Sequence, residues 1–334
     1  MKILIAGLGS IGRRHFRNFL ALGVRELVLV RKNLSTLPED ELQGYPVESE
    51  IEYAIQKHKP DGVVIANPTS QHLVSALPAI RAGLPVLLEK PISDSLDLVN
   101  EVRQSILLSG AKVLVGFQFR YHPTIQKARE IIQQGGIGQI LSAHAHWGEY
   151  LPNWHPWEQY QDSYAARKDL GGGVAVTLTH PIDYLRYLLG EIAEVRAFHG
   201  KVSPLQLWDV EDVVEIGLRF ANGAIGAAHL NYFQRPPSHH FEIIGSAGTL
   251  RWDNSDGTLT HFAMPDPFGK ISINPTPAVT KTYPLPQGFE RNDLFIAQTR
   301  HFLDLIAGTV NQPLCDFEDG VRALEVALQA KKDC

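Results

Sequence analysis

The first residues with a recognisable chemical pattern are three glycines near the N-terminus. Gly7, Gly9 and Gly12 directly follow a short apolar run and precede residues with helical periodicity. In a strand–turn–helix unit, the first glycine permits a tight turn, the second lets the backbone approach a pyrophosphate, and the third allows close packing of helix on strand. The N–H groups at the helix start would bind the phosphates. We therefore predict a dinucleotide site that also includes Ser10 and Ile11; the alternative is a glycine-rich turn without a ligand.

A second pattern concerns the 2′ position of the adenosine ribose. A site specific for NAD normally places Asp or Glu about 20 residues after the glycines, where it accepts a hydrogen bond from the 2′-hydroxyl. Arg31 occupies this place, 19 residues after Gly12, and Lys32 follows it. Two cations would pair with a 2′-phosphate, so we predict NADP as the preferred cofactor over NAD. The alternative is that both side chains face solvent.

Two further groups could supply acid–base chemistry. Lys90 stands in a Glu89-Lys90-Pro91 motif directly after an apolar run, and His180 and Asp183 follow three consecutive glycines, 171–173. Hydride transfer at a carbon–oxygen centre needs a group that gives or takes the hydroxyl proton; a lysine stabilises the developing oxyanion, and a histidine titrates near neutral pH. The alternatives are a solvated lysine and a structural histidine.

The elements around these motifs predict a doubly wound α/β domain. Apolar runs without alternation, typical of parallel strands covered on both faces, alternate with helical patterns. Strands are predicted at 2–6, 26–30, 61–66, 85–88 and 112–116, and helices at 11–22, 49–58, 71–82, 94–108 and 123–134. Ser93 or Asp94 could cap the fourth of these helices. In such a sheet ligands bind outside the carboxyl ends of the strands, which would direct Lys90 toward the nicotinamide.

The pattern changes after residue 135 to one that predicts an α+β domain with a large, mostly antiparallel open sheet. Residues 212–220 alternate apolar and polar side chains, and Asn222-Gly223 predicts a tight hairpin to the next strand. Strands are predicted at 140–148, 193–201, 212–220, 224–233, 239–244 and 249–252, and helices at 181–189, 290–307 and 317–331, with 264–288 as a loop. We divide the chain into a Rossmann domain, 1–120, and a substrate-binding and oligomerisation domain, 121–334, whose last helix could pack back on the first domain.

Several function classes are disfavoured by composition. The chain has 334 residues, of which 44% are hydrophobic and 20% charged, and its net charge is −5. No basic excess points to nucleic acid, and no apolar run is long enough for a membrane helix. Two cysteines in a chain of this length argue against a disulfide scaffold. We expect a cytoplasmic protein with neither nucleic-acid nor membrane partners.

Together these motifs resemble the glucose–fructose oxidoreductase / inositol dehydrogenase (Gfo/Idh/MocA) family over nearly the whole chain. The Glu89-Lys90-Pro91 motif and the triple glycine followed by His180 and Asp183 carry the resemblance most specifically. It is extended by Asn67-Pro68-Thr69 with His72, by the segment 116–120 and by the segment 245–250.

The resemblance implies an NAD(P)-dependent dehydrogenase or reductase. Such enzymes move a hydride between nicotinamide and a carbon–oxygen centre of a sugar, sugar acid, nucleotide sugar or cyclitol. Lys90 would hydrogen-bond the reacting oxygen and take part in proton transfer, His180 would be its acid–base partner, and the peptide before Pro91 would often be cis. The cofactor site implied by the resemblance also includes Asn67, Pro68, Thr69, His72, Glu89, Lys90 and Gln118.

One departure from the family pattern concerns catalysis. Many relatives carry an Asp three or four residues before the histidine, where this chain has Val176 and Thr177. Either Lys90 and His180 suffice, or Asp183 supports the site, or the reaction runs as a reduction, or the protein is a poor catalyst. Two alternative functions therefore stay open: a non-catalytic protein that senses NADP or a sugar, and a reductase of a non-sugar substrate such as a tetrapyrrole or imine.

Aromatic and basic residues in the second domain are candidates for the substrate site. Aromatic rings stack on sugar faces, and arginine can clamp a carboxylate or phosphate. The candidates are Arg120, Tyr150, Trp154, Arg167, Thr177 and Tyr232. The tryptophans could instead pack a domain interface. Fourteen histidines raise the question of a metal, but without a carboxylate or cysteine cluster we predict none. The open sheet predicts a homodimer or homotetramer.

Overall fold

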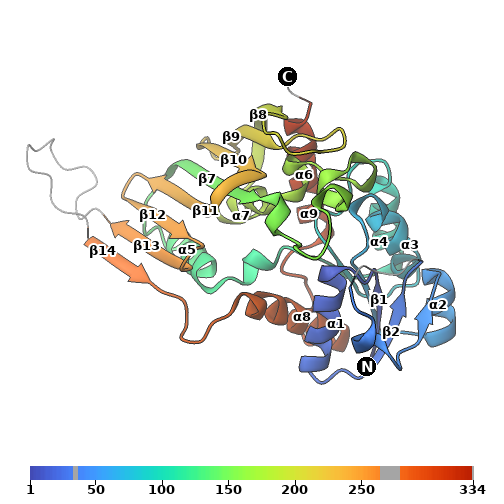
Figure 1. Cartoon of the computed structure of the whole chain (residues 1–334). Helices are drawn as coiled ribbons and strands as arrows, with labels where there is room; N and C mark the ends of the chain where they lie inside the picture. The colour runs from blue at the N-terminus through green and yellow to red at the C-terminus, as the bar shows by residue number, and fades with distance from the viewer. Residues whose placement is uncertain (33–36, 264–278, 333–334) are drawn as a thin grey trace, which may run out of the picture.

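The computed structural model describes residues 1–32, 37–263 and 279–332, which form two sheets with their covering helices (Figure 1). The predicted fold class is confirmed: a parallel Rossmann sheet of six strands is followed by a mostly antiparallel sheet of eight. No helix in the described ranges has the length and apolarity needed to cross a membrane.

The first sheet is the doubly wound sheet that the apolar runs predict. Its spatial order is β3-β2-β1-β4-β5-β6, and every pair is parallel. The strands are β1 (Lys2–Ala6), β2 (Glu26–Val30), β3 (Val47–Glu48), β4 (Gly62–Ile65), β5 (Val86–Leu88) and β6 (Val113–Val115). The two-residue strand β3, which carries no apolar run of its own, was not predicted. Strands β4, β5 and β6 are buried on both faces, as the absence of alternation requires.

Helices connect these strands at nearly the predicted positions. They are α1 (Ser10–Ala21), α2 (Ile51–His58), α3 (His72–Arg81), α4 (Val99–Ser109) and, after the last strand, α5 (Pro123–Gln133). The predicted start of α4 at residue 94 is wrong by five residues, and neither Ser93 nor Asp94 is its cap. The Ser93 hydroxyl instead accepts a hydrogen bond from the Ser95 backbone, which stabilises a turn ahead of the helix.

The second sheet has the order β14-β13-β12-β11-β7-β10-β9-β8, and only the β7–β10 pair is parallel. Its strands are β7 (Ile140–Tyr150), β8 (Ile192–Gly200), β9 (Val213–Phe220), β10 (Ile225–Asn231), β11 (Phe233–Gly245), β12 (Gly248–Asp253), β13 (Thr258–Ala263) and β14 (Val279–Tyr283). Strand β9 alternates buried and exposed residues as predicted, and the Asn222-Gly223 hairpin joins it to β10. Gly223 has a φ of +90°, which favours glycine in this turn.

The edge of this sheet differs from the prediction. Strand β13 was not predicted, and β14 lies inside the segment 264–288, which was predicted to be a loop; residues 264–278 of it lie outside the described ranges. Strand β14 pairs with β13 along five residues, and this pairing gives it its extended conformation. The prolines nearby in sequence favour a loop and give no signal for such a tertiary contact. A short helix, α6 (Val174–Thr177), was also missed ahead of α7 (His180–Leu189).

The two faces of the second sheet have different environments. Helices α5, α6 and α7 contact one face, so that inward residues such as Leu218, Leu230 and Trp252 are buried. The opposite face carries polar side chains and the ring of Phe198, which is 84% exposed. This is the one-sided burial that the alternating pattern predicts.

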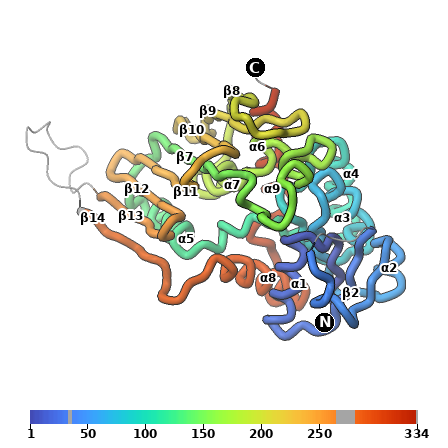
Figure 2. The backbone as a smooth tube through the Cα atoms, in the orientation of Figure 1, coloured from blue at the N-terminus to red at the C-terminus, as the bar shows by residue number. Residues whose placement is uncertain are grey.

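Helices α8 (Arg291–Ala307) and α9 (Phe317–Ala330) return from the second sheet to the first (Figure 2). Helix α8 packs on α1 through Phe302 and Phe19, and a methyl group on Gly62 would lie within about 3 Å of α8 side chains. Helix α9 packs on β6 and, on its other side, on α6, α7 and β8. Both helices therefore contact elements of the first sheet or its covering helices.

A buried charge network holds the junction of these parts. Arg120, in the turn after β6, donates to both carboxylate oxygens of Asp183 at the start of α7 and to Asp319 of α9. The guanidinium also donates to the Leu314 carbonyl at 2.9 Å. Arg120 and Asp183 are 3% and 1% exposed, so removal of Arg120 would leave the Asp183 carboxylate buried without its ion-pair partner.

Candidate active site

The glycine turn after β1 has the geometry expected of a pyrophosphate site. Gly7 has a φ of +92°, and a Cβ there would lie 2.4 Å from the Asn67 nitrogen. A Cβ on Gly12 would lie 1.9 Å from the Gly7 oxygen, whereas one on Gly9 would meet nothing within 4 Å. Helix α1 begins without a side-chain cap or an acid in its first turn, so its N–H groups stay available to an anion. These residues fit a dinucleotide.

The cations after β2 are already paired in the structure. Arg31 Nη1 lies 2.5 Å from a carboxylate oxygen of Glu39, and the exposed Lys32 lies 3.2 Å from Glu50. Buried Arg13 of α1 also binds Glu39, at 2.9 Å. Although burial acts to raise the pKa of Glu39, hydrogen bonds and charge from Arg31 and Arg13 hold it below its ordinary value. The ribose end of the site therefore contains an ionised acid between two guanidiniums, which the sequence did not indicate.

The turn after β4 is braced from inside. His72 places its two ring nitrogens 2.7 Å from the Pro91 carbonyl and 2.8 Å from the Asn67 carbonyl, so it ties this turn to the lysine motif. Thr69 is buried beside it, next to Pro68. The Asn67 amide donates to Ser75, while its Oδ1 is buried with no hydrogen-bond partner among the described residues. An unsatisfied acceptor at the mouth of this turn suits a ligand donor.

Glu89 anchors the lysine motif by its side chain. Its carboxylate, 5% exposed, accepts a hydrogen bond from His15 of α1 at 2.7 Å and one from the Lys90 backbone at 3.2 Å. Burial acts to raise the pKa of Glu89, but the hydrogen bond and charge of His15 keep it below its ordinary value. Gly116, after β6, makes room for this carboxylate, because a Cβ there would lie 2.8 Å from it.

Lys90 points from the end of β5 toward the second domain. Its Nζ donates to the Thr177 carbonyl at 2.9 Å, and the Lys90–Pro91 peptide is cis, as expected. Burial lowers the pKa of Lys90 to about 8, an effect that the charges of Glu89 and Glu149 partly oppose. The ammonium thus has a carbonyl, and not a carboxylate, as its direct partner at the place where relatives often carry Asp. A lysine with this pKa can both give and take a proton near neutral pH.

His180 lies at the first turn of α7 and is 2% exposed. Its Nε2 lies 3.3 Å from the Gln118 amide nitrogen, and its Nδ1 has no hydrogen-bond partner in the described parts of the chain. Burial, followed by the charge of Lys90, lowers the pKa of His180 well below its ordinary value, so the ring is neutral. Gly173 precedes the short helix α6 with a φ of +108° and packs against Glu211, which explains one of the three consecutive glycines.

Three of the predicted site residues form ion pairs within the protein. Arg120 and Asp183 pair with each other, as described above, and this pair fixes the start of the helix that carries His180. Arg167 pairs with Asp169 at 2.6 Å near the surface. The structure therefore does not bring Arg120 or Arg167 into contact with the lysine and histidine.

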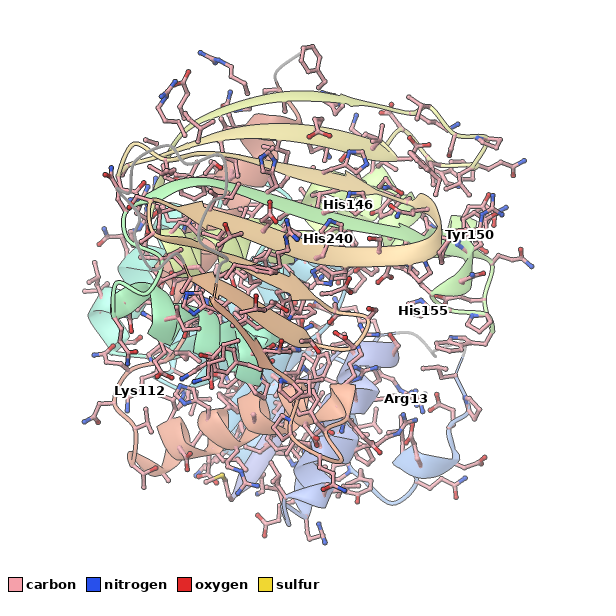
Figure 3. All side chains as sticks on the ribbon, turned by 90° about the vertical axis from the view of Figure 1, so that its left-hand side faces the viewer. Arg13, Lys112, His146, Tyr150, His155 and His240 are labelled. Atoms are coloured by element: carbon pink, nitrogen blue, oxygen red, sulfur yellow. The ribbon has the colours of Figure 1, made fainter. Side chains whose placement is uncertain are left out.

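Trp154, one of the aromatic candidates, lines a small hollow after β7. Trp154 lies edge-on to the buried ring of Tyr232 at 5.5 Å between centroids, and the Trp154 indole nitrogen has no hydrogen-bond partner among the described residues. The hollow is lined by Leu151, Trp154, His155, Tyr160, Ser163, Tyr164 and Ala165. Tyr150, labelled in Figure 3, stacks instead under Arg235 at 4.2 Å.

His155 joins this hollow to the glycine turn. Its Nε2 lies 3.3 Å from the Ser10 hydroxyl at the start of α1, and its Nδ1 lies 2.7 Å from Glu158. Its position, from a different domain than Ser10, could not be read from sequence spacing. The same holds for His15 and Arg13, whose helical positions face the core and gave no signal of their contacts with Glu89 and Glu39.

Three further histidines, His146, His229 and His240, form a row on the outer face of the second sheet. His146 lies between His229 and His240, with ring centroids 4.9 and 5.2 Å apart and interplanar angles of 8° (Figure 3). Parallel rings do not converge on one point, and the described residues contain no group of three or more His, Cys, Asp or Glu arranged to hold a metal ion.

The chain belongs to the Gfo/Idh/MocA family of oxidoreductases. Residues 1–117 match the model described as the oxidoreductase family with an NAD-binding Rossmann fold, and residues 125–251 match that of the GFO/IDH/MocA C-terminal domain. The family resemblance of the motifs is therefore confirmed.

Two curated relatives and one solved structure show how close the similarity is. Levoglucosan dehydrogenase of Pseudarthrobacter phenanthrenivorans is 30% identical over 56% of this chain, which spans only 54% of that protein. The uncharacterised oxidoreductase YrbE of Bacillus subtilis is 27% identical over 98% of this chain and 92% of its own length. A levoglucosan dehydrogenase structure with NADH and levoglucosan has the same fold, with a TM-score of 0.83 at 22% identity over 100% of this chain and 98% of that one.

The glycine turn yields a matched pair of variants. Gly12→Ala places a methyl group 1.9 Å from a backbone oxygen, so we expect loss of stability and of dinucleotide binding. Gly9→Ala places its methyl group in open space, so we expect an unchanged urea midpoint but dinucleotide affinity weakened by about tenfold or more, because the methyl occupies the path of the pyrophosphate. Equal binding by the Gly9 variant and the parent chain would contradict this site.

Proposed function

We propose that this protein is an NAD(P)-dependent dehydrogenase or reductase that transfers a hydride between nicotinamide and a C–O centre of a sugar, sugar acid, nucleotide sugar or cyclitol. The carrying observation is Lys90: a partly buried ammonium of lowered pKa at the carboxyl end of β5, near a neutral histidine whose Nδ1 has no hydrogen-bond partner among the described residues. Family membership and the sugar dehydrogenase among its relatives support the substrate class.

The catalytic roles follow from the charges of the two groups. NAD(P)H, when bound, supplies the hydride, and its oxidised form accepts one. In reduction, the Lys90 ammonium stabilises the developing alkoxide and gives it a proton; in oxidation, the neutral amine takes the hydroxyl proton. His180, neutral and held by Gln118, offers Nδ1 to a substrate hydroxyl. Asp183 acts as a positioning residue, because it fixes the start of α7 through Arg120.

The dinucleotide site draws on the turns at the ends of β1, β4 and β5. The open side of Gly9 and the start of α1 would hold the pyrophosphate, and the residues after β4 and β5 would border the nicotinamide. His72 acts there as a brace and not as a direct ligand, because both of its ring nitrogens face backbone carbonyls.

A lysine variant tests the catalytic proposal. Lys90→Met removes the proton donor, so we expect turnover to fall by about 10²-fold or more. In the parent enzyme, reduction should decline and oxidation should increase as the pH rises through about 8, the pKa of Lys90. Because the fold lowers this pKa from 10.5, the partly buried charge costs stability below pH 8, and the cost fades as the pH rises toward 10.5. Lys90→Met should therefore raise the unfolding midpoint at pH 7 while it lowers turnover.

The matched control is Lys112→Met. Lys112 also donates to a backbone carbonyl, that of Val310 at 3.3 Å, but it directly precedes β6, at the opposite end of the parallel strands from the glycine turn that follows β1. We expect this variant to retain turnover. Survival of turnover in Lys90→Met would refute the catalytic assignment. Dinucleotide binding by the parent chain without turnover of any sugar, polyol or ketone would favour the non-catalytic sensor.

We further propose that NADPH binds more tightly than NADH. No acid follows β2 at the usual position, and Arg31 would exchange its Glu39 partner for a 2′-phosphate, assisted by the exposed Lys32. Glu39 opposes this preference, because its carboxylate would lie close to the same phosphate.

Two substitutions separate these effects. Arg31→Ala should weaken NADPH binding by about tenfold while it changes NADH binding less, because only NADPH carries the phosphate. Glu39→Gln should strengthen NADPH binding relative to NADH. Dissociation constants from nicotinamide fluorescence measure both, and tighter binding of NADH by the parent chain would overturn the preference.

We propose that the exposed face of the second sheet associates with another copy to form a homodimer or homotetramer. Phe198, 84% exposed, continues the row formed by Glu215 of β9 and the stacked histidines, so an apolar ring stands at the end of a polar strip. Sedimentation should give at least a dimer, and Phe198→Glu should shift it toward smaller species. A monomer at micromolar concentration in the parent chain would rule this surface out.

A further inference from the structure

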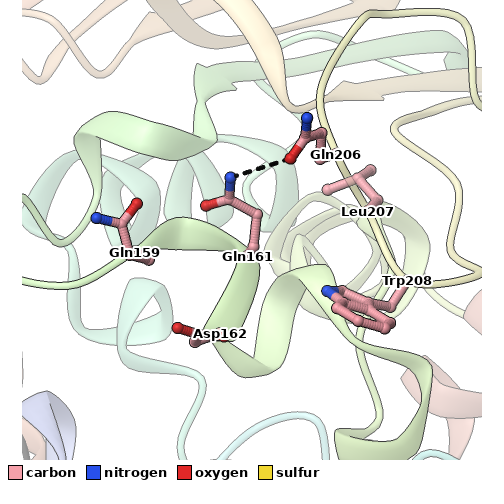
Figure 4. A pocket seen from close by; sticks show the side chains of 6 residues that line it. All are labelled: Gln159, Gln161, Asp162, Gln206, Leu207 and Trp208. Atoms are coloured by element: carbon pink, nitrogen blue, oxygen red, sulfur yellow. Dashed lines mark hydrogen bonds between the residues drawn. The ribbon is translucent and has the colours of Figure 1, made fainter.

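A second hollow lies outside the site described above, between the segments 159–162 and 206–208 (Figure 4). Its volume is about 520 Å³, and it is lined by Gln159, Gln161, Asp162, Gln206, Leu207 and Trp208. None of these residues belongs to a motif that predicts a function, and the proposed hydride transfer uses none of them.

The walls of this hollow are fixed to each other by backbone hydrogen bonds. The Trp208 nitrogen donates to the Ala166 carbonyl at 2.8 Å, and the Trp208 carbonyl accepts from Lys168 at 3.2 Å. Across the hollow, the Gln206 nitrogen donates to the Tyr160 hydroxyl at 3.0 Å. Trp208 is therefore held at its backbone while its indole stays 64% exposed.

The polar groups in the hollow are poorly satisfied by the protein itself. The Gln161 amide nitrogen lies 3.4 Å from the Gln206 side-chain oxygen, a long hydrogen bond (Figure 4). The Gln161 side-chain oxygen is shielded from solvent and has no partner in the described parts of the chain. A shielded acceptor without a partner costs free energy unless a ligand donates to it.

The charge around the hollow argues against an anion. None of the six lining residues is basic, and one is the acid Asp162. Of the cations nearby in sequence, Lys168 pairs with Asp209 and Arg167 pairs with Asp169, both at 2.6 Å, while Lys201 donates to the Ser203 carbonyl at 3.3 Å. An exposed indole face, planar amides and a carboxylate acceptor suit a ring with apolar C–H faces and several hydroxyl groups.

We propose that this hollow binds a neutral pyranose, with the sugar stacked on Trp208 and its hydroxyls hydrogen-bonded to Gln161, Gln206 and Asp162. The segment 159–165 lines both hollows, since Tyr160, Ser163 and Tyr164 border the one near Trp154. The bound ring is therefore either the distal ring of a longer substrate or a separate saccharide. The first case rests on the proposed hydride transfer, whereas the second does not.

Binding of defined saccharides to the full chain tests the proposal. The probes are methyl β-D-glucopyranoside, cellobiose and, as the charged comparison, glucuronate, each titrated to about 10 mM and followed by saturation-transfer NMR. We expect the two neutral probes to bind and glucuronate to bind more weakly. Trp208→Ala should weaken neutral binding by about tenfold, Trp208→Phe should restore part of it, and Gln161→Ala should also weaken it. Trp157→Ala, at a half-exposed tryptophan outside the hollow, should leave it unchanged.

Kinetics then identify the source of the ring. If the ring belongs to the substrate, Trp208→Ala raises KM for a disaccharide without a change in kcat or in KM for the monosaccharide. If the saccharide is separate from the substrate, Trp208→Ala loses saccharide binding while kcat and KM stay unchanged. The proposal is overturned if the parent chain binds none of the saccharides, or if Trp208→Ala binds them equally well. It is also overturned if Trp208→Ala changes the sedimentation of a chain that binds no saccharide. Unchanged dinucleotide affinity confirms that the variant is folded and keeps this result separate from a failure of the proposed function.

Discussion

The contact between the Lys90 ammonium and the Thr177 carbonyl is the interaction on which the rest of the site depends. It joins the end of a Rossmann strand to a short helix of the second domain, across the space where nicotinamide and substrate would meet. A charge in this place is costly, and the pKa lowered to about 8 measures that cost. The surrounding residues limit it: Glu89 supplies a fixed negative charge nearby, His15 holds that carboxylate, and Gly116 leaves space for it.

The missing acid before His180 has a clear structural consequence. A carboxylate beside Lys90 would hold its proton more tightly and would raise its pKa, whereas a backbone carbonyl offers only a dipole. Thr177 thus leaves the ammonium more acidic than a lysine–aspartate pair would be. The same environment keeps His180 neutral, because burial and the lysine charge both oppose its protonation. The two groups consequently differ in charge at neutral pH, and a differing pair can divide the roles of proton donor and hydrogen-bond partner.

How far the sequence could predict this molecule depends on whether a feature is local. The glycine turn, the Lys90 motif and the alternation of β9 were predictable, because each is a property of adjacent residues and a short period. The pairing of Arg120 with Asp183, of Arg31 with Glu39 and of His155 with Ser10 was not. Each joins side chains from separate segments, and a single sequence contains no signal for such contacts. Strand β14 was not predicted for the same reason, because its conformation depends on pairing with β13.

The path of the last two helices bears on how the protein is made. Residues 1–120 contain all six strands of the Rossmann sheet, yet Phe302 of α8 packs on α1, and α9 packs on β6. During synthesis the first domain therefore emerges from the ribosome with two apolar surfaces that its own sequence does not cover. They remain open until nearly the entire chain has been translated. A chaperone or a transient internal contact could cover these surfaces while the second domain is being translated. A chain shortened to residues 1–120 would leave them exposed permanently.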